Sequence, residues 1–432
     1  MSQRIVLIGA GSAMFGLGTL GDIFKEALLE GSTIVLHDIN AQTLQLTQRE
    51  AQRFIEKSGL SFTLEATTDR KEAVRGADFC IISIEVGDRY ELWEQDWKIP
   101  LQFGIHQVYG ENGGPGGFFH AMRIIPPILQ ICEDIAALAP KALVINLSNP
   151  MIRISHAVLT AFPDLRYVGL CHEIASLVHN LPILLGIRAN NLTIKAGGLN
   201  HFSVLLEVAR KDTGEALYPE IREKGSAYFR KAENYFGNQG ERDLCVEILE
   251  RFGYLPNTTD SHFGEYIHWA YDSVDHQGIL GFYADYKKAM LVPPLPAQER
   301  LALGSGEGEL WGIVPIISAL VSGREHSELA VNVRNDGLIN LLPDEMPVEV
   351  PGRIKEGALT GVSLNPYPKG FGALLQNQVG TTLLTTEAIL SRSKAIAKQA
   401  LLADPVFNRS KVVDELLETM IQLQHPYLDY LQ

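Results

Sequence analysis

A short apolar run that ends in a glycine-rich turn constrains the fold more than any other feature of this 432-residue chain. Residues 4–8 read Arg-Ile-Val-Leu-Ile, Gly9-Ala-Gly-Ser follows at once, and helical spacing of apolar residues extends from Phe15 to Glu30. A β-branched apolar run is typical of a strand buried on both faces. The glycines permit a tight turn and let the backbone approach a pyrophosphate at the helix N-terminus. The segment therefore predicts the first βα unit of a dinucleotide-binding sheet.

Apolar runs alternate with helical patterns through the first half of the chain. Further strands are predicted at 33–37, 61–65, 79–84, 142–147 and 166–170. Helices are predicted between them at 41–57, 69–75, 127–137 and 152–161. The alternation predicts an α/β fold whose parallel sheet carries helices on both faces. We assign residues 1–195 to a Rossmann-type domain like that of lactate and malate dehydrogenases.

The second half mixes strand-like runs with longer helical patterns. The strand-like runs lie at 191–195 and 202–210, and the helical patterns lie at 219–236, 241–252, 309–322, 383–403 and 412–431. We therefore expect residues 196–432 to form an α+β domain that closes over the edge of the sheet. This domain is expected to contribute to substrate binding, metal binding and subunit contacts.

Charge and cysteine usage narrow the class of protein. The chain has 37 Lys and Arg against 51 Asp and Glu, a net charge of −14. A negative field repels nucleic acid and anionic membrane surfaces, so a small-molecule partner is expected instead. The sequence has no run of 18 apolar residues, the length that a membrane span needs. Four cysteines do not suggest a disulfide framework, and they fit a reducing, cytoplasmic compartment.

Polar side chains at the ends of the predicted strands indicate a cofactor site. The carboxyl ends of parallel strands meet at one edge of a sheet, where ligands bind. A carboxylate at Asp38 accepts hydrogen bonds from a ribose diol and repels a 2′-phosphate, which favours NAD over NADP. A helix cap is the alternative role for Asp38, and Gly16 lies one position beyond the usual third glycine. The residues predicted to bind the cofactor are Gly9, Gly11, Ser12, Asp38, Glu85 and Asn149.

Cys171 and His201 are candidate metal ligands. Cys171 directly follows the apolar run at 166–170. His201 lies in the glycine-rich segment 197–201 between two predicted strands. A thiolate and an imidazole suit a divalent transition metal. Two protein ligands leave coordination positions open for water or a substrate diol. A buried cysteine and a hydrogen-bonded structural histidine are the alternative interpretation.

Two other segments concentrate polar side chains. Residues 111–117 (Glu-Asn-Gly-Gly-Pro-Gly-Gly) are interpreted either as a loop that contacts a ligand or as a surface loop packed by the two phenylalanines after it. In 260–268, helical spacing would place His262, Glu265 and Tyr266 on one face. A solvated face is the alternative there.

Taken together, these motifs resemble the NAD- and manganese-dependent family 4 glycoside hydrolases, which depart from two-carboxylate glycosidase chemistry. The segments that carry the resemblance are Gly9-Ala-Gly-Ser, Gly113-Gly-Pro-Gly-Gly, Ser148-Asn-Pro, Cys171-His-Glu, Gly198-Leu-Asn-His, Val331-Asn to Asn335-Asp-Gly, and Val348-Glu-Val-Pro. Cys171-His172-Glu173-Ile174 looks most like the α-galacturonidase subgroup, with α-glucuronidase and α-galactosidase as alternatives.

The resemblance implies a reaction and a set of roles. NAD would oxidise the sugar at C3, a base would remove the C2 proton, the glycosidic oxygen would leave, and water would add at C1. The substrate would be a small oligosaccharide or uronide. The implied roles are Cys171 and His201 as metal ligands, Asn149 at the sugar, His172 or Glu173 as the acid, and Asp260 or Tyr266 as the base. Arg89, Arg123 and His120 are candidates for binding a uronate carboxylate. The family also implies a homodimer or homotetramer.

Two other classes of protein share part of the predicted features. An NAD-dependent 2-hydroxy-acid dehydrogenase shares the predicted nucleotide fold, but it needs neither a metal pair nor so long a chain. A non-catalytic NAD-binding sensor needs a partner surface, and the sequence has no basic helix to bind DNA.

Overall fold

The computed structural model describes residues 2–11, 16–171, 173–233, 240–291, 295–305 and 312–432. Its centre is one mixed sheet of 12 strands, in the order β3-β2-β1-β4-β5-β6-β10-β11-β7-β8-β9, with β12 paired to β11. The first six positions have the 3-2-1-4-5-6 order of a dinucleotide-binding sheet. These parallel strands are β1 (Arg4–Ile8), β2 (Thr33–His37), β3 (Thr63–Thr67), β4 (Phe79–Ile82), β5 (Leu143–Asn146) and β6 (Arg166–Gly169). The predicted α/β fold with a Rossmann-type parallel sheet is confirmed.

Side chains of the parallel strands alternate between two apolar layers. In β1, Ile5 and Leu7 belong to the layer under α1 and α2, whereas Val6 and Ile8 belong to the layer under α5 and α6. Because successive side chains of a strand point to opposite faces, both faces need a helical cover. The covering helices are α1 (Gly16–Lys25), α2 (Ala41–Ser58), α3 (Arg70–Val74), α4 (Arg89–Gln102), α5 (Gly114–Leu138) and α6 (Met151–Ala161).

An antiparallel half extends the same sheet. A single register pair, Asn332 with Gly169, joins β10 to β6, and another, Glu349 with Gly198, joins β11 to β7. The strands of this half are β7 (Leu192–Leu199), β8 (Phe202–Arg210), β9 (Leu255–Pro256), β10 (His326–Arg334), β11 (Pro347–Lys355) and β12 (Ala358–Gly361). The two halves that the sequence separates near residue 195 are thus continuous through backbone pairing.

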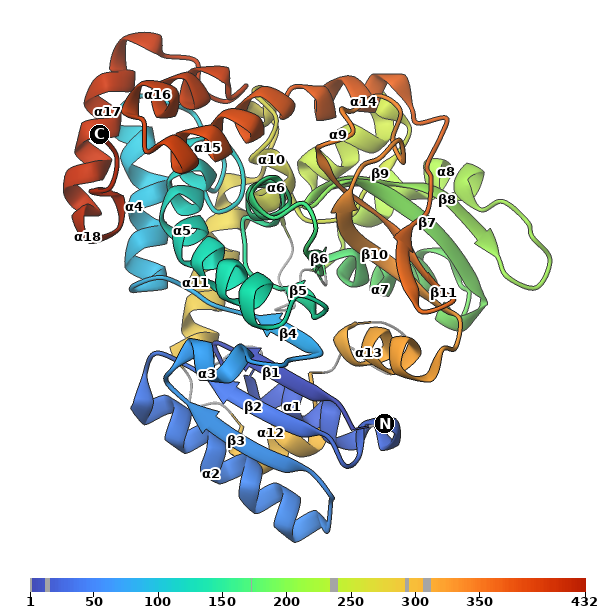
Figure 1. Ribbon diagram of the computed structural model, residues 1–432. Coiled ribbons are helices and arrows are strands. Elements are labelled where there is room, and N and C mark those ends of the chain that lie inside the picture. The colour runs from blue at the N-terminus through green and yellow to red at the C-terminus, as the bar shows by residue number, and fades with distance from the viewer. Residues whose placement is uncertain (1, 12–15, 172, 234–239, 292–294, 306–311) are drawn as a thin grey trace.

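The helices of the second half fall into two groups (Figure 1). Those nearer the antiparallel strands are α7 (Glu173–Leu185), α8 (Tyr218–Phe229), α9 (Asp243–Phe252), α10 (Asp260–Gly264), α14 (Lys369–Gln376) and α13 (Ile313–Ser322), of which α13 also contacts α1. The others pack on the N-terminal half: α11 (His276–Leu291), α12 (Ala297–Leu303), α15 (Val379–Ser391), α16 (Lys394–Ala403), α17 (Val413–Leu423) and α18 (His425–Leu428). The 3-10 turns are Ala27–Leu29, Ala189–Asn191, Ala270–Asp272 and Ser410–Val412. None of the described helices has the length and hydropathy needed to cross a bilayer.

The end of the chain returns to cover the first half. Apolar side chains of α15, α16 and α17 join the buried layer formed by β4, β5, α5 and α6, and Figure 1 shows these red helices beside α5 and α4. This segment was expected in the C-terminal domain, since helical periodicity gives no information about which half of the sheet a helix covers. One predicted helix, 383–403, is two helices, since Arg392 in a left-handed conformation (φ 57°) separates α15 from α16.

The glycine-rich segment 111–117 also differs from its predicted loop. From Gly114 onward it forms the first turn of α5, and its glycines are buried. A Cβ on Gly117 would lie 2.2 Å from the main chain of Asn112, and one on Gly116 would lie 2.4 Å from Gly110. Glycine is therefore required by close backbone packing and not by flexibility.

A buried ion pair fixes the returning helices in place. Arg153 of α6 lies 3.2 Å from the carboxylate of Asp404, and it also donates to the hydroxyl of Thr385 on α15 at 2.7 Å. The Arg153 and Asp404 side chains are 3% and 1% exposed. Removing one member of a buried pair leaves the other charge without compensation.

We predict that Arg153→Met lowers the free energy of unfolding by about 3–5 kcal/mol, because the Asp404 carboxylate stays buried without its cation. Adding Asp404→Leu should recover much of that loss, since the pair is then replaced by apolar groups. Urea unfolding of the two variants measures this. The half-exposed pair Arg230–Glu250 supplies the control: Arg230→Ala should change stability by less than about 1 kcal/mol.

Candidate functional site

The glycine turn after β1 meets the carboxylate that ends β2. The Gly11 N–H donates to Asp38 Oδ2 at 2.9 Å, and the Asn40 N–H donates to Asp38 Oδ1 at 2.9 Å. Gly9 has φ 86°, and a Cβ there would lie 2.0 Å from the carbonyl oxygen of Ser83. The turn and Asp38 therefore form one rigid corner at the carboxyl edge of the sheet.

Gly16 fulfils the third glycine position despite its displaced spacing. It begins α1, and a Cβ on it would lie 2.4 Å from the carbonyl oxygen of Ala10. This close helix–strand contact is the one that the third glycine of a dinucleotide motif provides. A small pocket lies beside the turn and is lined by Gly9, Ala10, Gly16, Thr19, Ser83 and Leu147. The described part of the turn fits a dinucleotide, and Ser12 lies outside the described residues.

Cys171 and His201 meet at the centre of the sheet edge. The Cys171 Sγ is 3.1 Å from the His201 Nε2. Cys171 follows β6, and His201 lies in the tight turn between β7 and β8 with φ 60°, a left-handed conformation that is uncommon for a non-glycine residue. The turn thus directs an imidazole at a thiol 30 residues earlier. Thiolate and imidazole are the donor set of a transition-metal site.

The charge around Cys171 also fits a cation. Burial raises the pKa of the Cys171 thiol well above its usual value, and the carboxylates of Glu173 and Glu349 act in the same direction. Hydrogen bonds from the Asn200 side chain and the Glu173 backbone favour the thiolate, and a divalent metal would favour it further by its positive charge. Among the described residues, no cluster of three or more His, Cys, Asp and Glu side chains has the geometry of a metal site. The candidate metal donors among the described residues are therefore this pair.

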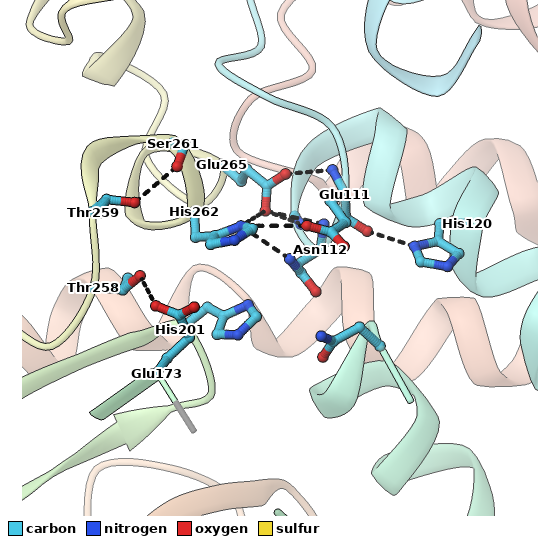
Figure 2. A network of polar contacts seen from close by, with 12 residues as sticks. Glu111, Asn112, His120, Glu173, His201, Thr258, Thr259, Ser261, His262 and Glu265 are labelled. Atoms are coloured by element: carbon cyan, nitrogen blue, oxygen red, sulfur yellow. Dashed lines mark hydrogen bonds and ion pairs between the residues drawn. The ribbon is translucent and has the colours of Figure 1, made fainter. Parts of the chain in front are cut away.

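A second histidine lies against the first. The rings of His262 and His201 stack with their centroids 4.7 Å apart. His262 Nδ1 is 3.3 Å from Asn112 Nδ2 and 3.6 Å from a Glu111 carboxylate oxygen (Figure 2). Burial lowers the pKa of His262, but the surrounding carboxylates, with Glu111 the strongest, outweigh burial and raise it.

Glu265 anchors the N-terminus of α5 to this network. Its carboxylate accepts the backbone N–H groups of Glu111, Asn112 (3.0 Å) and Gly113 (3.2 Å). Burial raises the pKa of Glu265 to about 7 against the attraction of His262 and these hydrogen bonds. An anion at a helix N-terminus is stabilised by the helix dipole. Glu265 thereby fixes Glu111 beside His262, so the face that carries His262, Glu265 and Tyr266 is part of the site and is not a solvated face.

The predicted acid and base fall in different places. The Glu173 carboxylate accepts the Thr258 hydroxyl at 2.6 Å (Figure 2), while His172 lies outside the described residues. The Tyr266 hydroxyl donates to the carbonyl oxygen of Asn200 at 3.3 Å, one residue before His201. Asp260 is fully buried, and its two oxygens accept the N–H groups of Leu244 and Cys245, both at 2.9 Å, in the first turn of α9. The contacts of Asp260 are those of a helix cap.

Two of the predicted substrate-binding residues lie at or near the network, and the third does not. His120 Nδ1 is 2.8 Å from the carbonyl oxygen of Glu111, and its Nε2 is 3.4 Å from the Glu85 carboxylate, so His120 and Glu85 both border the network. Asn149 follows β5 and is half-buried, accepting the Met151 N–H at 3.2 Å. Arg123 does not join them. It is 4% exposed and forms a buried ion pair with Asp96, so we remove it from the substrate-binding set.

Arg89 reaches the network but is already paired. Its guanidinium donates to Glu111 at 2.8 Å and lies 3.8 Å from the Glu85 carboxylate. The guanidinium also lies over the Trp93 ring at 5.4 Å and the Tyr286 ring at 5.7 Å.

The sequence analysis named Glu111, His262 and Glu265 without assigning them a role. Two sequence signals precede this network: Glu111 followed by a glycine-rich stretch, and a histidine five residues after Asn257. Both patterns are too common in protein sequences to identify a network. Only the long-range contacts, 150 or more residues apart in sequence, reveal it.

A nucleotide-type sheet with a thiol–imidazole pair at its carboxyl edge defines a dinucleotide-fold enzyme with a metal-binding donor set. Comparisons with known proteins identify the family. Residues 4–187 match the Family 4 glycosyl hydrolase domain, and residues 196–407 match the Family 4 glycosyl hydrolase C-terminal domain. The chain is 46% identical to an alpha-glucosidase of Erwinia rhapontici over the full length of both chains. This chain belongs to the family 4 glycosyl hydrolases.

A more distant relative and two solved structures also match the chain. An alpha-galacturonidase of Bacillus subtilis is 26% identical, with 97% of each chain covered. The structure of a 6-phospho-alpha-glucosidase from gut microorganisms, solved with NAD and Mn2+, matches with a TM-score of 0.80 at 21% identity over 98% of each chain. A malate dehydrogenase from Plasmodium falciparum, solved with NADH, matches with a TM-score of 0.53 at 14% identity, covering 90% of this chain and 99% of its own. These two structures support the predicted fold, including its dehydrogenase-like sheet.

The position of Asp260 gives a test that separates a cap from a base. We predict that Asp260→Asn retains kcat within about 10-fold of the wild type, because the amide oxygen can still accept one of the two N–H groups at the start of α9. A general base contributes about 10²–10⁴-fold to the rate. Steady-state kinetics with thermal unfolding as the folding control measure this. A loss of that larger size in a folded variant would restore Asp260 as the base.

Proposed function

We propose that this family 4 enzyme hydrolyses neutral α-glucosides by the NAD- and metal-dependent route. The observation that carries the proposal is the 3.1 Å approach of Cys171 Sγ to His201 Nε2 at the carboxyl edge of a dinucleotide-type sheet. When bound, NAD would accept and return the C3 hydride, and a divalent metal such as Mn²⁺ would polarise the sugar oxygens at C2 and C3.

The chain's own residues would bind, orient and exchange protons. Gly9, Gly11 and Asp38 would hold the dinucleotide, while Cys171 and His201 would hold the metal. Ionisable groups for proton transfer must lie within hydrogen-bond reach of the reacting atoms. The Tyr266 hydroxyl contacts the carbonyl oxygen of Asn200, the residue before His201. Tyr266 is therefore a better candidate for the base than Asp260.

The acid would come from the start of α7, and other groups would hold the sugar. Glu173 is the described candidate for the acid, oriented by Thr258, and His172 remains the alternative. Asn149, Glu111 and His262 would hold sugar hydroxyls, because amide, carboxylate and imidazole groups all form hydrogen bonds with them.

The charge of the site favours a neutral sugar over a uronate. The two guanidinium groups considered for a uronate are both paired: Arg89 with Glu111 and Glu85, and Arg123 with Asp96. Glu111 and Glu173 lie close to the histidine stack, so a substrate carboxylate there would meet like charge. The full-length similarity to an alpha-glucosidase supports a glucoside. The α-galacturonide implied by Cys171-His172-Glu173 is the second candidate, and His120 is the residue that would serve it.

We predict that p-nitrophenyl α-glucoside is hydrolysed with a kcat/KM at least about 100-fold above that of the α-galacturonide, because an unpaired buried charge costs several kcal/mol. The assay contains NAD, Mn²⁺ and a thiol reductant, each omitted in turn, with the α-galactoside and α-glucuronide in parallel. Release that requires NAD and metal, shows no net NADH and slows with C2-deuterated sugar supports the proposed route. Faster release from the galacturonide would reverse the choice of sugar. NADH accumulating on 2-hydroxy acids without glycoside cleavage would overturn the glycosidase.

We also predict that Cys171→Ala lowers Mn²⁺-dependent kcat/KM by about 10²-fold or more, because it removes one of two described protein ligands. NAD binding, followed by protein fluorescence, should change little, since the glycine turn and Asp38 are untouched. Cys245→Ala, at a buried thiol on α9, is the matched control and should retain activity. Full activity in Cys171→Ala would contradict the metal-ligand role.

A further inference from the structure

Glu349 of β11 is a buried carboxylate that the proposed mechanism does not use. It is 2% exposed and accepts hydrogen bonds from four neutral side chains. The donors are Asn200 Nδ2 at 2.6 Å, Ser203 Oγ at 2.9 Å, Asn257 Nδ2 at 3.2 Å and Asn332 Nδ2 at 3.5 Å. None of these described partners is a cation. A buried carboxylate with four neutral donors is costly to desolvate, so a structural core would be served as well by a neutral group.

Glu349 occupies a special place in the strand register. Across the four neighbouring strands β6, β10, β11 and β7, one row of paired residues reads Gly169, Asn332, Glu349 and Gly198. The row joins the parallel half of the sheet to the antiparallel half. Cys171 lies two residues after Gly169, and His201 lies three residues after Gly198. The row therefore sets the separation of the two predicted metal ligands.

Asn200 connects this carboxylate to both ligands. Its side chain donates to Glu349 and forms a hydrogen bond with the Cys171 thiol, and its main chain continues directly into His201. Its carbonyl oxygen accepts the Tyr266 hydroxyl. The strands pack closely at this row, since a Cβ on Gly197 would lie 2.5 Å from the carbonyl oxygen of Glu349. The backbone therefore has little room to shift when the Glu349 side chain is changed.

We propose that Glu349 is a positioning residue that acts through Asn200 and Asn332 to hold Cys171 and His201 at metal-binding separation. The inference rests on the metal dependence of the proposed function. Groups that orient metal ligands from behind typically change metal affinity or activity by about 10–100-fold when mutated.

The test is Mn²⁺ binding to the full chain, followed by the electron paramagnetic resonance signal of free Mn²⁺, without NAD or sugar. Glu349→Gln keeps the size of the side chain and presents an NH₂ group to donors that need an acceptor. We expect its Mn²⁺ affinity to fall about 10–100-fold, while kcat at saturating Mn²⁺ stays close to that of the wild type. Glu349→Asp keeps the charge but moves it away from Asn200, so the Mn²⁺ affinity of this variant should fall too. Glu349→Asp also provides the test if Glu349→Gln does not fold.

Glu328→Gln is the matched control. Glu328 is a buried carboxylate on the neighbouring strand β10, and it bonds to the Gly312 N–H and to His326. It should bind Mn²⁺ like the wild type. Wild-type affinity in both Glu349 variants, or an equal loss in Glu328→Gln, would overturn the positioning role and leave the proposed function intact. A wild-type chain that binds no Mn²⁺ would overturn the metal-dependent function itself.

Discussion

The need to cover both faces of a parallel sheet organises this molecule. Continuous apolar strands such as β1 and β4 send side chains to both sides, and neither side can meet water. Helices α1 and α2 cover one face, with α12 and α13 beside them, while α5 and α6 cover the other beneath α15 to α17. Because this packing fixes the carboxyl edge of the sheet, it also fixes the corner made by Gly9 and Asp38 and the place where β6 delivers Cys171.

The sequence predicted the parallel half well because its signals are local. The strands were expected from short β-branched runs, and even the displaced Gly16 kept its function in the fold. The approach of Cys171 to His201 was also accessible, since each residue directly adjoins a predicted strand, Cys171 after 166–170 and His201 before 202–210. The resemblance to family 4 glycosidases was confirmed as well.

Features that depend on distant contacts were not accessible from sequence. The glycines of Gly113-Gly-Pro-Gly-Gly have poor helix propensity, yet α5 begins at Gly114 because the carboxylate of Glu265 accepts three backbone N–H groups just before it. The family resemblance made Asp260 a candidate base, and only the location of α9 shows what its oxygens contact. Arg123 looked available for a uronate until Asp96 was found against it. In each case the partner lies on another element, and no periodicity encodes it.

The tie between Arg153 and Asp404 also has a consequence for synthesis. The two residues are 251 positions apart. A ribosome adding about 5–20 residues per second would need roughly 12–50 s to cover that distance. For that time the dinucleotide-binding half exists with its arginine unpaired and part of one apolar face uncovered. The nascent half is thus expected to bind chaperones. This face of the sheet is covered only when the last fifth of the polypeptide has emerged.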